Sequence, residues 1–245
     1  MGNILISGAS SGIGAALAKA YAAPGAKLVL WGRDHERLDR IAEACRGRGA
    51  EADTQAFDLT DTAALLAALA AAEPVEIAYF NAGLGGSLAR DAVAQEPLHV
   101  ARMSAVNFSA PVIGANCVAA GMAARGSGRI VLIGSIAGLF PLPMAPVYSG
   151  TKAGLKMFAE ALSARLARHG VSVTLVSPGF IDTPMSRGLK EPRPFLIGPD
   201  QAAAVIKRKV ARGARHVIVP WPFAIVAAIA GLIPGALARA ILSRF

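Results

Sequence analysis

The sequence has few cysteines, and neither of them stands in a metal-binding or disulfide pattern. Cys45 and Cys117 lie far apart among the 245 residues, with no CxxC pair or Cys/His cluster. This spacing argues against a disulfide framework and a zinc site, and it suits a reducing cytoplasm. We therefore expect no bound metal. Cys117 lies in the apolar run 112–120, so we expect a buried structural thiol there.

Charged residues are also scarce, at 17% of the chain against 54% hydrophobic residues. This composition excludes a disordered chain, and the length allows one large domain with a fully buried sheet. Aromatic residues make up only 6%, and the basic residues behind the net charge of +9 do not cluster with them. No nucleic-acid partner is therefore expected. The charge suits solubility, a phosphorylated small molecule or anionic lipid.

The chain opens on an apolar strand, without a basic segment followed by an apolar run, so we expect no signal or transit peptide. Apolar strands then alternate with longer helical patterns. Runs such as 27–31 and 129–134 are continuously apolar, as in strands that are buried on both faces. The alternation predicts an α/β fold, with one domain and a doubly wound, mostly parallel sheet of seven strands covered by helices on both faces. The expected strands are 3–7, 27–31, 51–56, 75–80, 129–134, 171–176 and 216–219, and the expected helices are 12–23, 34–46, 60–72, 96–123, 146–169 and 199–212.

A glycine-rich turn, Ser7-Gly-Ala-Ser-Ser-Gly-Ile-Gly14, follows the first expected strand and leads into a helix. Gly8 would permit the tight turn, Gly12 would let the backbone approach a pyrophosphate, and Gly14 would let the helix pack closely on the strand. The helix N-terminus would direct free N–H groups and a positive dipole at the phosphates. A ligand-free strand–turn–helix connection has a similar sequence, but the position after the first strand favours a nucleotide site.

Further motifs follow in a fixed order. Asn81-Ala-Gly83 comes after the fourth expected strand, Tyr148-Ser-Gly-Thr-Lys152 opens a helix, and Ser177-Pro-Gly179 comes after the sixth strand. Together with the G-x-x-x-G-x-G spacing of the turn, they resemble the short-chain dehydrogenase/reductase (SDR) family from residue 3 to about 220. The resemblance implies a Rossmann-type fold and hydride transfer between a nicotinamide cofactor and a carbonyl or alcohol substrate.

The resemblance also implies the site residues. It assigns a catalytic tetrad of Asn107, Ser135, Tyr148 and Lys152. The implied cofactor-binding residues are Gly8, Ser10, Ser11, Gly12, Ile13, Gly14, Arg33, Asp58, Leu59, Asn81, Ala82, Gly83, Tyr148, Lys152, Pro178, Gly179, Ile181 and Thr183. In the family, residues matching Asp58 and Leu59 lie against the adenine. Lys152 would hold the nicotinamide ribose, and Asn107 would hold a water that links the lysine to solvent.

The chemistry of these residue types fits those roles. Tyr148 and Lys152 are four apart and share a helix face. A nearby ammonium would lower the phenol pKa from about 10, so that Tyr148 could donate or accept a proton at the substrate oxygen. Ser135 ends a strand at the carboxyl edge, where ligands bind in open α/β sheets. Each residue alone has an ordinary interpretation as a surface, cap or turn residue. Their order and placement together favour a site.

The end of the second strand bears on the choice of cofactor. NAD-specific sites place an acid about 20 residues past the glycine turn. Aligned on the family pattern, Gly32 takes that position and Arg33 the next one. Arginine offers planar donors to a 2′-phosphate, so NADP(H) is favoured over NAD(H), with a solvated loop cation as the alternative. Asp34 stands one step too late and is better explained as the N-cap of the next helix.

Three mostly apolar segments, 84–86, 136–144 and 181–199, are the expected substrate walls. They favour a hydrophobic ketone or aldehyde. Arg187, Lys190 and Arg193 in the last segment could instead meet a carboxylate or phosphate, or be only surface charges. The histidines at 35, 99, 169 and 216 adjoin no motif and are expected to be surface or packing residues.

Residues 217–238 contain no charged residue. The first three complete the last strand and three prolines interrupt the rest, so a membrane-spanning helix is not expected. We therefore divide the chain into a catalytic domain, 1–220, and a hydrophobic extension, 221–245. The extension would pack on the domain, on another subunit of a homodimer or homotetramer, or on a membrane surface of a cytoplasmic enzyme.

Two other functions stay open. One is an NAD-linked alcohol dehydrogenase, which relative binding of the two nicotinamide cofactors would distinguish. The other is a nucleotide-binding or membrane-bound scaffold without turnover. The complete tetrad argues against the scaffold.

Overall fold

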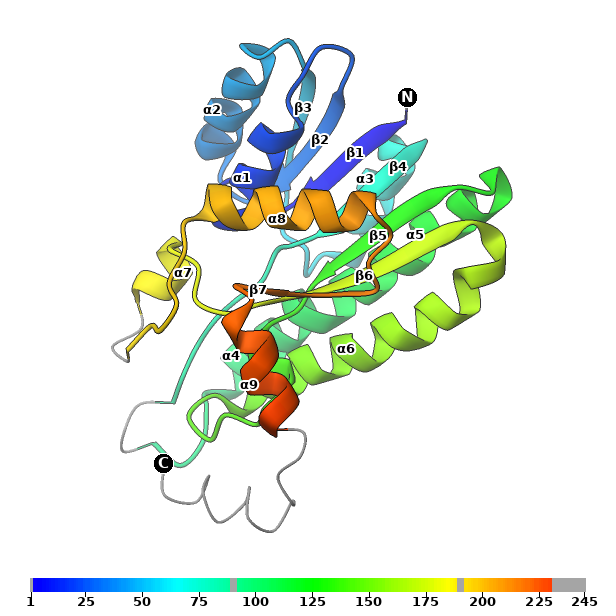
Figure 1. The fold of residues 1–245 in the computed structure, drawn as a ribbon. Coiled ribbons are helices and arrows are strands. Elements are labelled where there is room, and N and C mark those ends of the chain that lie inside the picture. The colour runs from blue at the N-terminus through cyan, green and yellow to red at the C-terminus, as the bar shows by residue number, and fades with distance from the viewer. Residues whose placement is uncertain (1, 89–91, 189–191, 231–245) are drawn as a thin grey trace.

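A computed structural model describes residues 2–88, 92–188 and 192–230 (Figure 1). In this part of the chain seven strands form one sheet in the order β3-β2-β1-β4-β5-β6-β7, and every neighbouring pair is parallel. The strands are β1 (Asn3–Ser7), β2 (Lys27–Gly32), β3 (Glu51–Ala56), β4 (Val75–Phe80), β5 (Gly128–Ile133), β6 (Val171–Pro178) and β7 (His216–Val219). The predicted α/β fold with its doubly wound parallel sheet is confirmed, and the strand ends lie within about two residues of expectation.

The order of the strands creates a switch point between β1 and β4. The chain runs outward from β1 to β2 and β3, and then returns to place β4 on the other side of β1. Loops leaving the carboxyl ends of β1 and β4 therefore diverge and leave a crevice, which is the usual ligand position in such sheets.

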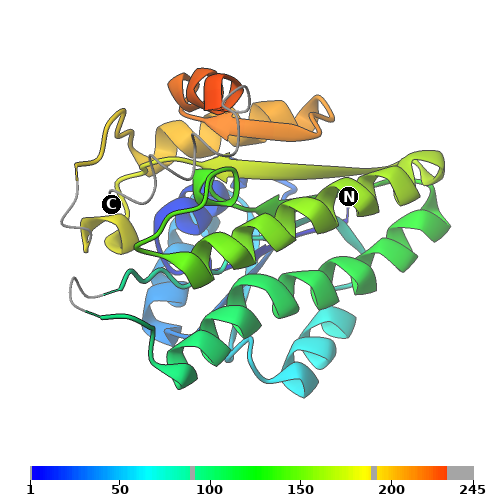
Figure 2. The same ribbon diagram turned by 90° about the horizontal axis from the view of Figure 1, so that it is seen from below.

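Helices cover both faces of the sheet (Figures 1 and 2). One face carries α1 (Gly12–Tyr21), α2 (His35–Arg46) and α8 (Pro199–Ala211), and the other carries α3 (Thr62–Ala72), α5 (Ala110–Arg125) and α6 (Pro146–Leu166). Adjacent strand residues such as Leu5 and Ile6 are both fully buried, each in the core of a different face. This explains why the strands are apolar without alternation.

The first residues of α2 confirm one local prediction. The Asp34 carboxylate accepts a hydrogen bond from the Arg37 N–H at 3.0 Å, as an N-cap does. Leu38, Ala42 and Cys45 recur at helical spacing and are buried against the sheet.

The helix expected at 96–123 is interrupted. It consists of α4 (Pro97–Ser104), a π-helical turn at Ala105–Ser109 and α5. Pro97–Arg125 is also a stretch long and apolar enough to cross a membrane, and half of its most apolar window is buried. A helix packed on the core of a folded domain has the same composition.

The prediction of a buried Cys117 is wrong, because this thiol is exposed. Ala115, Val118 and Ala119 form the inner face of α5, and Cys117 points to the opposite side. An almost entirely apolar helix gives the sequence no contrast between its two faces, which is why composition misled here.

Candidate active site

The glycine-rich turn is held to the end of β4 by one asparagine and one serine. Asn81 Nδ2 donates to the carbonyl oxygens of Ser7 and Gly8 at 3.0 and 3.2 Å. The buried Ser7 Oγ accepts the N–H groups of Asn81 and Ala82 at 3.0 and 3.1 Å. Gly8 has a φ of +66°, and a Cβ there would lie 2.8 Å from the Ala82 Cα, so only glycine fits. The two motifs are therefore in direct contact.

Gly14 explains the close packing of α1 on this turn. A Cβ at Gly14 would lie 2.2 Å from the Gly8 carbonyl oxygen, so the first turn of α1 cannot accept a larger residue. Ser10, Ser11, Gly12 and Ile13 remain partly exposed beside it. Their exposed backbone and the free N–H groups of the helix N-terminus suit a bound pyrophosphate.

Asp58, Leu59 and Arg33 lie on the β2–β3 side of the crevice. Asp58 Oδ1 accepts hydrogen bonds from the Thr60 N–H and hydroxyl at 3.0 and 2.9 Å, and its Oδ2 is paired with Arg102 of α4. The Thr60 hydrogen bond, with the charges of Arg102 and Arg33, holds the pKa of Asp58 below its usual range. The exposed Arg33 is therefore close enough to act electrostatically on the position expected to meet the adenine.

Lys152 and Asn107 both lie next to Gly83. The buried Lys152 Nζ donates to the Ile133 carbonyl oxygen at 2.8 Å. A Cβ built on Gly83 would lie 3.4 Å from Asn107 Oδ1 and 3.6 Å from Lys152 Nζ. Burial lowers the pKa of Lys152 to about 8. Three elements that are distant in sequence thus bring together two members of the expected tetrad.

The π-helical turn aims Asn107 at the loop after β4. The Asn107 amide accepts from the Leu84 N–H at 2.7 Å and donates to the Leu84 carbonyl oxygen at 2.8 Å. A polar side chain that is fully buried in a helix needs such partners. Single π-helical turns of this kind are frequent at functional sites.

Tyr148 and Ser135 form the other half of the tetrad. Ser135 follows β5 and caps a short 3₁₀ turn at Ile136–Gly138, and its side chain accepts the Ala137 N–H at 3.1 Å. Burial raises the pKa of Tyr148, and a hydrogen bond with Ser135 opposes that rise. The Lys152 ammonium lies 5.8 Å from the centre of the Tyr148 ring. The sequence led us to expect a lowered pKa for the Tyr148 phenol, whereas its pKa in this structure is raised, with burial as the main cause.

The segment after β6 brings the remaining motif to the same crevice. Ile181 is buried, and Thr183 lies against the glycine turn, with its Cγ2 3.0 Å from a Cβ built on Gly12. Thr183 also caps α7 (Pro184–Arg187), from which Met185 reaches across to Gly85. Pro178 ends β6 and Gly179 continues its pairing by donating to the Val219 carbonyl oxygen at 2.8 Å.

The charged residues of the expected substrate walls have different surroundings. Arg187 is paired with Asp182 through two hydrogen bonds of 2.8 and 3.0 Å. Lys190 lies outside the described residues. Arg193 Nη1 is buried and makes no hydrogen bond within the described part of the chain.

Two histidines make contacts near the site. His216 Nε2 shares a hydrogen bond of 2.9 Å with Ser177 Oγ of the Ser-Pro-Gly motif. His99 packs against Gly86 of the expected substrate wall. The His216 contact could not be found from sequence spacing, because it joins segments that are far apart along the chain.

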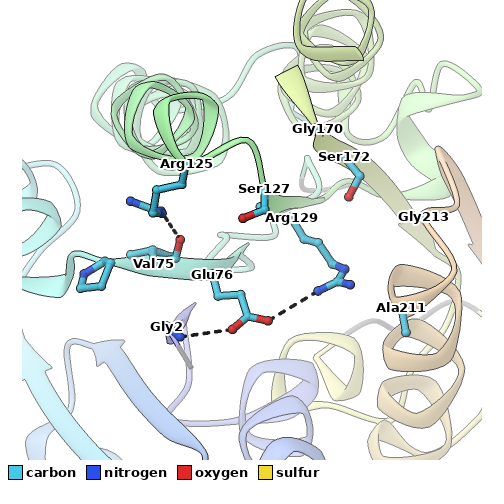
Figure 3. Close-up of a pocket in the computed structure, with 12 residues that line it drawn as sticks. Gly2, Val75, Glu76, Arg125, Ser127, Arg129, Gly170, Ser172, Ala211 and Gly213 are labelled. Atoms are coloured by element: carbon cyan, nitrogen blue, oxygen red, sulfur yellow. Dashed lines mark hydrogen bonds and ion pairs between the residues drawn. The ribbon is translucent and has the colours of Figure 1, made fainter. Parts of the chain in front are cut away.

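A further cavity lies at the opposite edge of the sheet (Figure 3). Its volume is about 600 Å³, and it is lined by the starts of β4, β5 and β6. Arg125 donates to the Val75 carbonyl oxygen and pairs with Glu73, and Arg129 lies 3.8 Å from Glu76. The residues of the expected tetrad are absent from its lining, so this cavity is not the candidate active site.

Sequence reasoning missed two contributors to the site, Ser7 and Arg102. Ser7 could have been found, since it is a polar residue between an apolar strand and the glycine turn. Arg102 acts through its pairing with Asp58, a contact that only the folded chain creates.

Comparison with known proteins gives a consistent result. The sequence pattern described as short chain dehydrogenase matches residues 2–194. Gluconate 5-dehydrogenase from Gluconobacter oxydans is 32% identical over 189 residues, which is 76% of this chain and 73% of that protein.

Two solved structures share the whole fold. A short-chain dehydrogenase from Sphingobium yanoikuyae in complex with NADPH has a TM-score of 0.84 and 31% identity, covering 96% of this chain and 98% of its own. A bulky-bulky ketone specific alcohol dehydrogenase from Comamonas testosteroni has a TM-score of 0.80 and 29% identity, covering 96% of both chains. The ordered motifs, the strand order and these matches agree, and the chain belongs to the short-chain dehydrogenase/reductase family of oxidoreductases.

Proposed function

We propose that this SDR oxidoreductase transfers hydride between NADP(H) and the carbonyl or alcohol group of a hydrophobic substrate, with Asn107, Ser135, Tyr148 and Lys152 as its catalytic residues. The observation that carries the proposal is the convergence of the four residues. They come from the π-helical turn, the end of β5 and α6. Asn107 and Lys152 lie beside the loop after β4, and the centre of the Tyr148 ring is 5.8 Å from the Lys152 ammonium.

The acid–base step follows from burial. Because burial raises the pKa of Tyr148, the phenol is protonated at neutral pH and can donate its proton to a carbonyl oxygen. When bound, the nicotinamide cofactor supplies the hydride to the carbonyl carbon. Ser135 opposes the rise in the pKa of the phenol, and its hydroxyl can hold the same substrate oxygen. In the reverse direction a Tyr148 phenolate accepts the alcohol proton.

Lys152 and Asn107 support that proton transfer. The Lys152 ammonium stabilises the phenolate that forms when Tyr148 has given up its proton. With a pKa of about 8, Lys152 can itself pass a proton at neutral to mildly basic pH. Asn107 fixes the Leu84 backbone beside them, and the family resemblance adds a water that connects the lysine to solvent.

The cofactor site fits a phosphorylated dinucleotide. The turn at residues 8–14 is partly open and lies at the N-terminus of α1, which suits the pyrophosphate. Arg33 is exposed at the end of β2 and close to Asp58, where it can bind a 2′-phosphate. The NADPH complex of the Sphingobium protein supports the same choice.

A hydrophobic substrate is supported by the apolar rim of the crevice. Leu142, Met185 and Phe195 are exposed on the segments expected to wall the site. The Comamonas protein, named for bulky ketones, supports a large carbonyl substrate, whereas the gluconate relative makes a polar substrate the alternative.

The proposal for the carboxyl-terminal extension covers only its described part. We propose a catalytic domain of 1–220, with α9 (Pro222–Ala230) packed on it through Phe223. Trp221 and Ile229 remain exposed, and we propose that another subunit of a cytoplasmic homodimer or homotetramer covers them, with a membrane surface as the alternative. Residues 231–245 lie outside the described residues.

The test is initial-rate NADPH oxidation with aldehydes and ketones of increasing chain length, with a polar keto acid for comparison. We expect rates to rise with chain length. Tyr148→Phe should lower kcat by about 10²- to 10⁴-fold without weakening NADPH binding. Unchanged turnover in this variant would overturn the proposed mechanism, and higher rates with the keto acid would overturn the proposed substrate class.

A further inference from the structure

Helix α9 meets the body of the protein through one aromatic side chain. Phe223 is only 6% exposed, whereas Ile225 on the same helix is 52% exposed. Its ring lies directly on Gly179 of the Ser-Pro-Gly motif, since a Cβ built there would be 2.3 Å from Phe223 Cε2. A side chain at position 179 would therefore clash with Phe223, which lies more than forty positions later in the chain.

The Phe223 ring also organises the neighbouring segments. The centres of the Phe180 and Phe195 rings lie 6.0 and 5.5 Å from the centre of the Phe223 ring, and both pairs are edge-on. Phe195 has a φ of 56°, a conformation that a bulky residue adopts only when its surroundings hold it. The Ile197 N–H donates to the Phe180 carbonyl oxygen, and the Asp182 N–H donates to the Ile197 carbonyl oxygen.

The same segment touches the cofactor turn at its other end. Thr183 packs on Gly12, and Met185 packs on Gly85 of the loop after β4. Residues 179–185 therefore span the distance between Phe223 and the glycine-rich turn, with the aromatic ring behind the segment and the crevice in front of it. A change in the volume of the ring must move the wall that faces the crevice, because closely packed interiors transmit such changes.

We propose that Phe223 is a positioning residue for the nicotinamide half of the cofactor. By filling the space behind Gly179 it sets the place of residues 179–183 relative to Tyr148 and Lys152, and it leaves the adenine half untouched. The inference rests on the proposed cofactor site. Phe223 would lie on the outer side of the wall, away from the reacting atoms.

The test uses Phe223→Leu, with Phe223→Ala as the larger truncation and Ile225→Ala as the control on the exposed side of α9. Binding of NADPH is measured by its own fluorescence, and binding of 2′,5′-ADP, which carries only the adenine half, by calorimetry. Thermal unfolding of each variant is recorded alongside. We expect Phe223→Leu to weaken NADPH binding about tenfold and to lower kcat, since small misplacements of reacting groups are costly. The Kd of 2′,5′-ADP should stay within about twofold of the wild-type value. Ile225→Ala should leave the Kd of both ligands unchanged.

Each other outcome has a distinct meaning. Equal weakening of both ligands would show that Phe223 only supports the fold, and unchanged NADPH binding in Phe223→Leu would show that the wall does not depend on it. Either result overturns the inference. If wild-type protein binds neither NADPH nor 2′,5′-ADP, the proposed cofactor site itself is wrong. If wild type binds both and only the variant comparison fails, the cofactor site stands without the positioning role.

Discussion

Lys152 shows how burial changes the chemistry of a single side chain. The ammonium is 4% exposed and makes one hydrogen bond, to the Ile133 carbonyl oxygen. Loss of water disfavours the charged form and lowers the pKa from 10.5 to about 8. The folded protein therefore binds fewer protons than the unfolded chain between these two pH values.

This lysine should make stability depend on pH in a defined direction. Where the unfolded state binds more protons, the free energy of unfolding rises with pH. Relative to Lys152→Met, wild-type protein should thus gain about 2–3 kcal/mol between pH 7 and pH 10. The measurement is urea unfolding of both proteins at each pH.

Lys156→Met is the matched control, because Lys156 lies on the same helix with its ammonium beside Glu160 and in contact with water. No comparable gain relative to that variant is expected. A constant difference between wild type and Lys152→Met across the pH range would show that Lys152 is not buried as a cation.

Arg33 should decide between the two cofactors. Arg33→Ala removes charged donors from the proposed 2′-phosphate site and should raise the Kd of NADPH about 10- to 100-fold. NADH binding should change by less than about twofold, because NADH has no 2′-phosphate. Arg40→Ala, which removes another exposed cation from the same region, controls for net charge. Equal losses for both cofactors would contradict the assignment.

At the scale of elements, the site depends on the packing of the 3₁₀ turn after β5 against α6. A Cβ at Gly138 would lie 2.7 Å from the Lys152 carbonyl carbon and oxygen. This contact places Ser135 beside the helix that carries Tyr148 and Lys152. No motif marks Gly138, because the requirement arises only when two distant elements meet.

Replacing glycine by alanine, once at Gly138 and once at Gly150 in α6, should distinguish a change in this contact from the general effect of glycine on helix stability. Gly138→Ala must push the turn away from α6 and should lower kcat at least about tenfold. Gly150→Ala, also in the region of the tetrad, meets no atom within 4 Å and should stabilise the helix by about 0.5–1 kcal/mol. Steady-state rates and thermal unfolding of both variants provide the measurement. A fully active Gly138→Ala protein would mean that the turn can shift without moving Ser135.

At the scale of the whole molecule, α9 leaves an apolar surface that the described part of the chain does not cover. Trp221 is 71% exposed and Ile229 is 58% exposed, which is unusual for large side chains on a monomer. Multi-angle light scattering should therefore give a mass of two or four chains of 25.0 kDa. A mass of one chain, together with sedimentation on lipid vesicles, would favour a membrane surface instead.

Local sequence signals were sufficient to predict the sheet, its parallel strands and the motifs. Short, continuously apolar runs that alternate with longer helical patterns are typical of strands covered on both faces, and the spacing of glycines depends on local backbone geometry. Both signals are local, so they can be recognised without knowledge of the fold. The same holds for the Asp34 cap, which involves residues three positions apart.

How those motifs meet, and how their surroundings change them, could be read only from the folded molecule. The rise in the pKa of Tyr148, the outward side of Cys117, the His216–Ser177 hydrogen bond and the Phe223 ring behind Gly179 each depend on segments far apart in sequence. Burial and long-range contacts are properties of the packed molecule. The periodicity of the sequence cannot predict them, because the path of the whole chain determines which residues come into contact.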